Sequence, residues 1–169
     1  VLLYFCFAKI GGAHQIELSL RPQSVLNVRM KKLALFPLPG HNEYTLANGL
    51  RIIHQPAYSN VAYCGFAVDA GTRDELENEQ GMAHFVEHLI FKGTQKRKAW
   101  HILNRMENVG GDLNAYTNKE ETVVYAAFLK EHLERALELL GDIVFHSTFP
   151  QHEIEKETEV IIDEIQSYE

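Results

Sequence analysis

The sequence has few cysteines, no long apolar run and no surplus of basic residues. Its two cysteines, Cys6 and Cys64, cannot form a disulfide framework, so a hydrophobic core must stabilise the fold. The apolar stretch at residues 1–8 is far shorter than the ~20 residues of a membrane-spanning helix, so we expect no integral membrane segment. With 23 acidic against 16 basic residues, the formal net charge is −7, which argues against a nucleic-acid partner.

Two histidines and a glutamate lie together in the segment His84–His88, which reads HFVEH. Residues four apart lie on the same face of a helix, where two imidazoles can bind the same zinc ion. Each residue of a helix advances about 100°, so Glu87 lies beside the pair without joining it. The order H-x-x-E-H is the inverse of the commoner H-E-x-x-H motif of zinc peptidases. The segment predicts two metal ligands with a carboxylate base beside them.

A catalytic zinc usually has three protein ligands, so a third must come from another element. Residues 153–165 have helical periodicity and contain several glutamates. Glu157 and Glu164 are seven residues apart and therefore share one helix face. A glutamate ligand would complete a His₂Glu set, as in thermolysin-type enzymes.

These features together resemble the pitrilysin or insulinase class of zinc peptidases, and within it the processing-peptidase branch and its bacterial relatives. The resemblance rests on the inverted motif, on Glu164 at 76 positions after His88, and on the acidic residue seven before Glu164. It extends from about His41 to the last residue. Four further stretches contribute: residues 48–51, 70–73, 110–117 and 121–125.

The resemblance implies one Zn²⁺ per chain, bound by His84, His88 and Glu164. Glu87 is implied to be the catalytic residue. Glu157 is implied either to support a ligand from behind or to be an alternative ligand. Without the resemblance, Glu157 would be interpreted as part of a solvated helix face. A purely structural zinc site is disfavoured because such sites are rich in cysteine, and none is near these residues.

The resemblance also implies that Asn114 and Ala115 position the substrate. An edge strand at these residues could pair with an extended peptide through main-chain hydrogen bonds. Asn114 could instead be an ordinary turn or hairpin residue. The expected partners are a peptide or unfolded protein substrate and either a second domain of the same fold or a partner subunit.

The pattern of strands and helices predicts an α+β fold, with one mostly antiparallel sheet and helices packed mainly on one face. We expect Val61–Ala70 to be a strand buried on both faces, with Cys64 as a small buried hydrophobe. The basic run Lys92–Lys98 is expected to be a solvated loop. The other predicted elements are a hairpin at 43–55, strands at 112–117 and 122–129, and helices at 80–91, 98–108, 131–145 and 151–168.

Residues 9–29 show no clear periodicity, and residues 1–40 are predicted to be a non-homologous or processed N-terminal extension, with Met30 as an alternative start. Residues 41–169 are predicted to be an N-terminal zinc peptidase domain that is truncated at its C-terminal end. We favour a cytoplasmic location, and a periplasmic or secreted one if the N-terminus is a shortened signal peptide.

The sequence therefore predicts a zinc-dependent metalloendopeptidase that hydrolyses extended peptides or small proteins. Water activated by zinc would attack the peptide bond, with Glu87 as general base. The alternative is a non-catalytic partner or scaffold subunit of the same fold, which the intact His84, Glu87, His88 and Glu164 disfavour.

Overall fold

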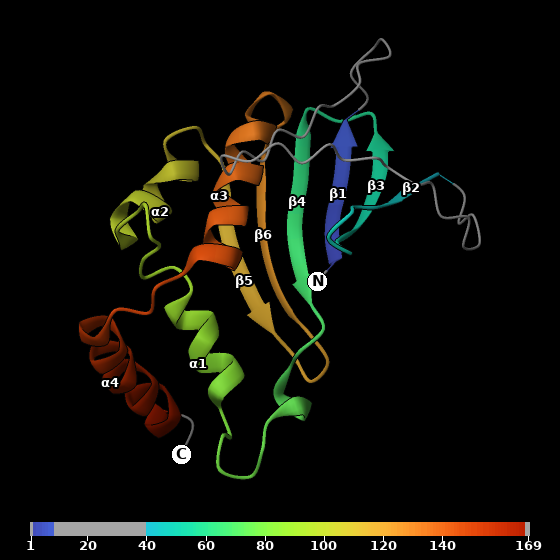
Figure 1. The fold of residues 1–169 in the computed structure, drawn as a ribbon. Coiled ribbons are helices and arrows are strands. Elements are labelled where there is room, and N and C mark those ends of the chain that lie inside the picture. Colours follow the sequence, from blue (N-terminus) through green and yellow to red (C-terminus); the bar gives the residue numbers. More distant parts are fainter. Residues whose placement is uncertain (1, 9–39, 168–169) are drawn as a thin grey trace.

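The computed structural model describes residues 2–8 and 40–167, and its sheet is built from six strands in the order β2-β3-β1-β4-β6-β5 (Figure 1). All neighbouring strands are antiparallel except β1 and β3. This confirms the predicted, mostly antiparallel sheet. The strands are β1 (Leu2–Ala8), β2 (Asn42–Thr45), β3 (Arg51–Ala57), β4 (Val61–Val68), β5 (Asp112–Thr117) and β6 (Thr122–Leu129).

The apolar run at the N-terminus forms β1, which lies between β3 and β4 within the sheet. The sequence predicts no element there, because a short apolar run with no periodicity fits several structures equally well. Residues 9–39, including Met30, lie outside the described residues. The predicted domain boundary at residue 40 therefore stays a prediction.

Four α-helices in the described residues flank the sheet (Figure 1). Helix α3 packs on β4 and β6, α1 and α2 contact β5, and α4 contacts α1. No helix within residues 2–8 and 40–167 combines the length and the apolar composition of a membrane span. The helices are α1 (Met82–Leu89), α2 (Ala99–Glu107), α3 (Leu133–His146) and α4 (Gln151–Ser167), with short 3-10 helices η1 (Thr72–Asp74) and η2 (Lys130–His132).

The core lies between the sheet and helices α2 and α3. Burying each large side chain there contributes about 1.5–3 kcal/mol. Cys64 is 2% exposed, as predicted for a small buried hydrophobe, and burial raises the pKa of its thiol. The other fully buried large side chains of this core are Phe66, Ile102, Met106, Val124, Phe128, Leu139, Leu140 and Ile143.

The prediction that the β4 strand is buried on both faces is wrong. Ala62, Cys64 and Phe66 are buried, whereas Val61 and Tyr63 are 42% and 54% exposed. Successive side chains of a strand point to opposite faces, and helix α3 covers only one of them. Buried and exposed side chains therefore alternate along the first part of the strand, although most of its residues are apolar.

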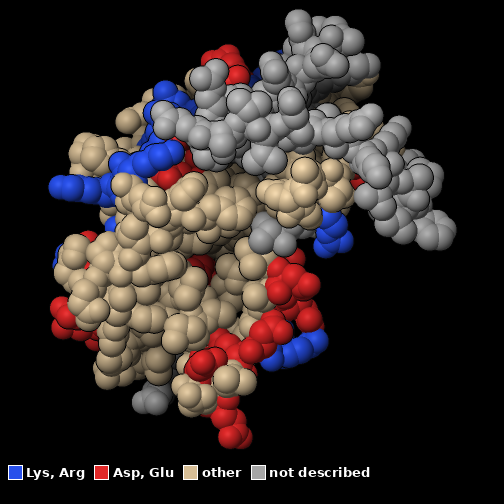
Figure 2. Space-filling model, in the orientation of Figure 1, with Lys and Arg blue, Asp and Glu red and all other residues tan. Residues whose placement is uncertain are grey.

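The loop before α1 is held against the turn between β5 and β6. The backbone N–H groups of Thr72 and Arg73 donate to the carbonyl oxygens of Asn118 and Lys119, each at 3.0 Å. Gly71 allows this approach, because a Cβ atom there would lie 2.5 Å from the Asn118 oxygen. Acidic side chains gather over this lower part of the molecule (Figure 2). The loop thus fixes the start of α1 relative to the hairpin that carries β5.

Candidate metal centre

The side chain of Glu75 caps the start of helix α1. The Glu75 carboxylate accepts hydrogen bonds from the backbone N–H groups of Gly81 (2.9 Å) and Ala83 (2.8 Å). A carboxylate at this end satisfies free N–H groups and is favoured by the helix dipole. Gly81 adopts φ 89°, a left-handed conformation that suits glycine, so the helix starts at Met82 and not at the predicted residue 80.

His84 and His88 present their Nε2 atoms to each other across one turn of α1. The two atoms lie 3.1 Å apart, and the rings are perpendicular with centroids 4.7 Å apart. Both side chains are partly buried at the side of the helix that faces α4. The predicted pair of imidazoles therefore converges on one point.

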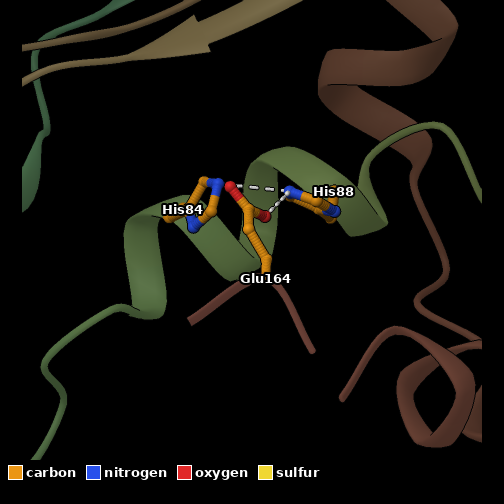
Figure 3. A group of neighbouring side chains, drawn as sticks. All are labelled: His84, His88 and Glu164. Carbon is orange, nitrogen blue, oxygen red and sulfur yellow. Dashed lines mark hydrogen bonds and ion pairs between the residues drawn. The ribbon is translucent and has the colours of Figure 1, made fainter. Parts of the chain in front are cut away.

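Glu164 reaches the same point from helix α4. Its Oε2 atom lies 3.9 Å from His88 Nε2, and one ligand atom each from His84, His88 and Glu164 all lie within 4.8 Å of one another. In Figure 3 the Glu164 carboxylate points towards both imidazole rings. The structure thus brings together three residues that are up to 80 positions apart in the sequence.

The cluster fits the requirements of a zinc ion. Tetrahedral zinc with Zn–N distances of 2.0–2.1 Å holds its ligand atoms about 3.3–3.4 Å apart. The separations His84 Nε2–His88 Nε2 (3.1 Å) and His88 Nε2–Glu164 Oε2 (3.9 Å) lie on either side of that value, and all three ligand atoms lie within 4.8 Å of one another. Two imidazoles and a carboxylate are also the donor set that leaves a fourth position for a reactant.

Glu157 contacts His88 from behind the cluster. Because an ionised carboxylate can only accept, His88 Nδ1–H donates to Glu157 Oε2, at 3.2 Å. The same carboxylate pairs through Oε1 with Lys92 Nζ at 2.5 Å. Burial alone would raise the pKa of the Glu157 carboxyl, but hydrogen bonds and charges from Lys92 and His88 lower it below its usual value. Of the two predicted roles, this geometry favours a group behind the ligand over an alternative ligand.

Glu87 lies on α1 beside the two histidines and is half-buried. Among the residues that the structure describes, its carboxylate has no hydrogen bond or ion pair, and it is not part of the ligand cluster. The structure thus places Glu87 beside the candidate ligands but not among them.

Asn114 and Ala115 lie on β5, which is an edge strand of the described sheet. The hydrogen bond from Asn118 N to Glu121 O sets the alternation of the β5–β6 ladder. By this alternation, the backbone N–H and C=O of Ala115 face away from β6. Asn114 Oδ1 accepts from this N–H at 2.8 Å. The edge predicted for peptide pairing is therefore present, next to helix α1.

The prediction that Lys92–Lys98 is a solvated loop is wrong for two of its basic residues, and Thr94 in the same segment is buried. Lys92 pairs with the buried Glu157, and Arg97 pairs with Glu138 and the buried Asp142. A buried carboxylate requires a cation or several hydrogen bonds, and helices α3 and α4 bring these acids to the loop. The only local sign of a role for Lys92 is its spacing of four residues from His88.

The α+β fold thus carries a His₂Glu cluster on the inverted motif, and both features agree with a peptidase class of domain. A model of the insulinase family (peptidase family M16) matches residues 51–169, and the chain belongs to that family.

Several known proteins are similar to the chain. Over 167 residues, 99% of the chain, it is 40% identical to the mitochondrial-processing peptidase subunit beta of Rattus norvegicus. Over 75% of the chain, it is 42% identical to the uncharacterized zinc protease YmxG of Bacillus subtilis. It covers 31% of the length of each of these relatives.

Solved structures show the same fold. A protease from Helicobacter pylori superimposes on 75% of the chain with a TM-score of 0.72 and 30% identity. The periplasmic protease PqqL from Escherichia coli covers 79% of the chain with a TM-score of 0.73 and 28% identity. The chain covers 31% and 16% of these two proteins, respectively.

Proposed function

We propose that this chain carries the zinc site of a metalloendopeptidase that hydrolyses peptide bonds in extended peptides or small proteins. The observation that carries the proposal is the convergence of His84, His88 and Glu164 beside an unengaged Glu87. Membership of a peptidase family supports it, as does the similarity to a protein named as a zinc protease. A non-catalytic subunit of the same fold would have no need of the complete set.

One zinc ion per chain would be bound by His84, His88 and Glu164. When bound, zinc would act as a Lewis acid that polarises the peptide carbonyl and acidifies water. Glu87 would accept a proton from the attacking water and return it to the leaving amine. Glu157 would hold His88 through Nδ1, so that the unprotonated Nε2 faces the metal position.

The substrate would lie along the free edge of β5. The outward C=O of Ala115 would pair with an extended peptide, and its N–H would do so after release from Asn114 Oδ1, which occupies it in this structure. The Glu164 side chain is 37% exposed, so this chain alone leaves one side of the cluster open to solvent. We propose that a second domain of the same fold, or a partner subunit, covers that side and excludes water during the reaction.

Removal of the metal should abolish hydrolysis, and zinc should restore it. The complete protein, treated with a strong chelator, is expected to lose cleavage of a fluorogenic, unstructured peptide and to regain it at about one zinc per chain. The measurement is a titration of rate against added zinc. Full activity in the metal-free protein, or no zinc uptake at all, would overturn the proposal.

Substitution Ala115→Pro should impair substrate binding more than the fold. Proline removes the outward N–H and is tolerated at an edge position that does not bond within the sheet. Because part of the pairing with the peptide is lost, KM should rise by roughly fivefold, equivalent to the ~1 kcal/mol of one hydrogen bond. Zinc content and thermal unfolding measured in parallel serve as controls. An unchanged KM would exclude peptide pairing at Ala115.

A further inference from the structure

Lys92 lies behind the candidate metal centre, where Glu157 separates it from His88. It follows the end of α1, where its backbone N–H donates to the Leu89 carbonyl oxygen at 3.0 Å. Its Nζ atom lies 2.5 Å from Glu157 Oε1, while Glu157 Oε2 accepts from His88 Nδ1 at 3.2 Å. Glu157 belongs to α4, and His88 belongs to α1. The contacts from Lys92 through Glu157 to His88 therefore link the two helices that supply the ligands.

The Glu157 carboxylate has three states open to it in this position. It could take up a proton, it could turn towards the metal position, or it could stay ionised as the partner of His88. Its side chain is only 8% exposed, so water contributes little to keeping it ionised. Besides His88, Lys92 is the only residue in the described ranges that forms an ion pair with it.

The geometry of the ion pair selects the third state. Lys92 binds Oε1, so that this oxygen is not available to a metal, and it orients the carboxylate with Oε2 towards Nδ1 of His88. A carboxylate at Nδ1 fixes the tautomer in which Nε2 carries the lone pair. In that tautomer, His88 Nε2 faces His84 Nε2 and the Glu164 carboxylate.

We propose that Lys92 is a positioning residue of the metal centre, which keeps Glu157 bound to His88 and out of the metal's coordination shell. This inference rests on the proposed function, because it presupposes zinc at His84, His88 and Glu164. It assigns a role to a lysine in a segment whose sequence indicates only a solvated loop.

The test measures zinc affinity by competition with a chromophoric chelator, in the complete protein. Lys92→Met should weaken zinc binding by roughly 10- to 100-fold, the usual effect of losing a group that orients a ligand. Lys92→Arg keeps the cation and should retain most of the affinity. Lys96→Met, an exposed lysine in the same loop, is the matched control and should bind zinc like the unmodified protein.

Combination with Glu157→Gln separates the proposed role from a general effect on the fold. If Lys92 acts through Glu157, Lys92→Met should cause little further loss of zinc affinity in the Glu157→Gln protein. Replacement of zinc by Co²⁺ adds a second readout, because its visible spectrum reports the ligand set and should change in Lys92→Met when Glu157 is released.

Two results would overturn the inference. One is a Lys92→Met protein whose zinc affinity and Co²⁺ spectrum match those of the unmodified protein. The other is an undiminished loss of affinity when Lys92→Met is added to Glu157→Gln, which would mean that Lys92 acts by another route. Failure of the proposed function looks different, because the unmodified protein itself would then not bind zinc.

Discussion

Replacement of Glu87 by glutamine is expected to abolish peptide hydrolysis while the zinc content stays the same. Glutamine has the shape of glutamate but cannot take a proton from water at neutral pH. General acid–base catalysis typically contributes roughly 10²- to 10⁴-fold, so the rate should fall by at least this factor. The geometry predicts retention of zinc, because Glu87 lies outside the cluster of His84, His88 and Glu164. The measurement is kcat together with metal analysis of the same preparation.

Glu77→Gln is the matched control for this substitution. Glu77 is an exposed glutamate in the loop before the same helix, so its loss removes the same charge without touching the centre. Its activity should equal that of the unmodified protein. A Glu87→Gln protein that loses its zinc would require Glu87 to be a ligand, and one that keeps full activity would require another base.

The local part of the site can be predicted from the sequence because it depends on one helix. His84, Glu87 and His88 are related by helical periodicity alone, and the structure places the two imidazoles as that periodicity requires. The heptad spacing likewise predicts that Glu157 and Glu164 share a face of α4. Both side chains do reach His88.

Helical spacing could not show which nitrogen of His88 each glutamate meets. That depends on how α4 packs across α1, since a shift of about two turns would bring one carboxylate to the place of the other. The resemblance to a peptidase family supplied the choice of Glu164 as ligand. The structure then separates the two residues: Glu157 meets Nδ1, and Glu164 lies nearer Nε2.

Residues whose partners are distant in the sequence were missed. Lys92 and Arg97 have no acidic partner in their own loop, so their sequence resembles an exposed basic run. Their partners are in α3 and α4, 41 to 65 residues further along the chain. Strand β1 escaped prediction for a related reason, because its neighbours β3 and β4 lie more than 40 residues further on. Contacts between distant segments of the chain determine these features, and the periodicity of the local sequence does not reveal such contacts.

Replacement of His88 by alanine is expected to remove zinc and activity together, in contrast to Glu87→Gln. His88 is the only residue of the cluster that contacts both Glu157 and Glu164. Its loss removes one of three protein ligands, and it also removes the contact between the ligand cluster and Glu157. Because structural and catalytic zinc sites depend on the full ligand set, most of the affinity should disappear. Metal analysis should show a fall from about one zinc per chain to a small fraction of that.

The fold should survive this substitution, which makes the result interpretable. Glu157 keeps its ion pair with Lys92, so no buried charge is left without a partner. His101→Ala, which changes an exposed histidine on α2, controls for the loss of an imidazole and should keep both zinc and activity. An unchanged zinc content in His88→Ala would mean that the ion binds elsewhere. The convergence of the three side chains would then reflect helix packing alone, and His84 and Glu164 would lose their assigned roles with it.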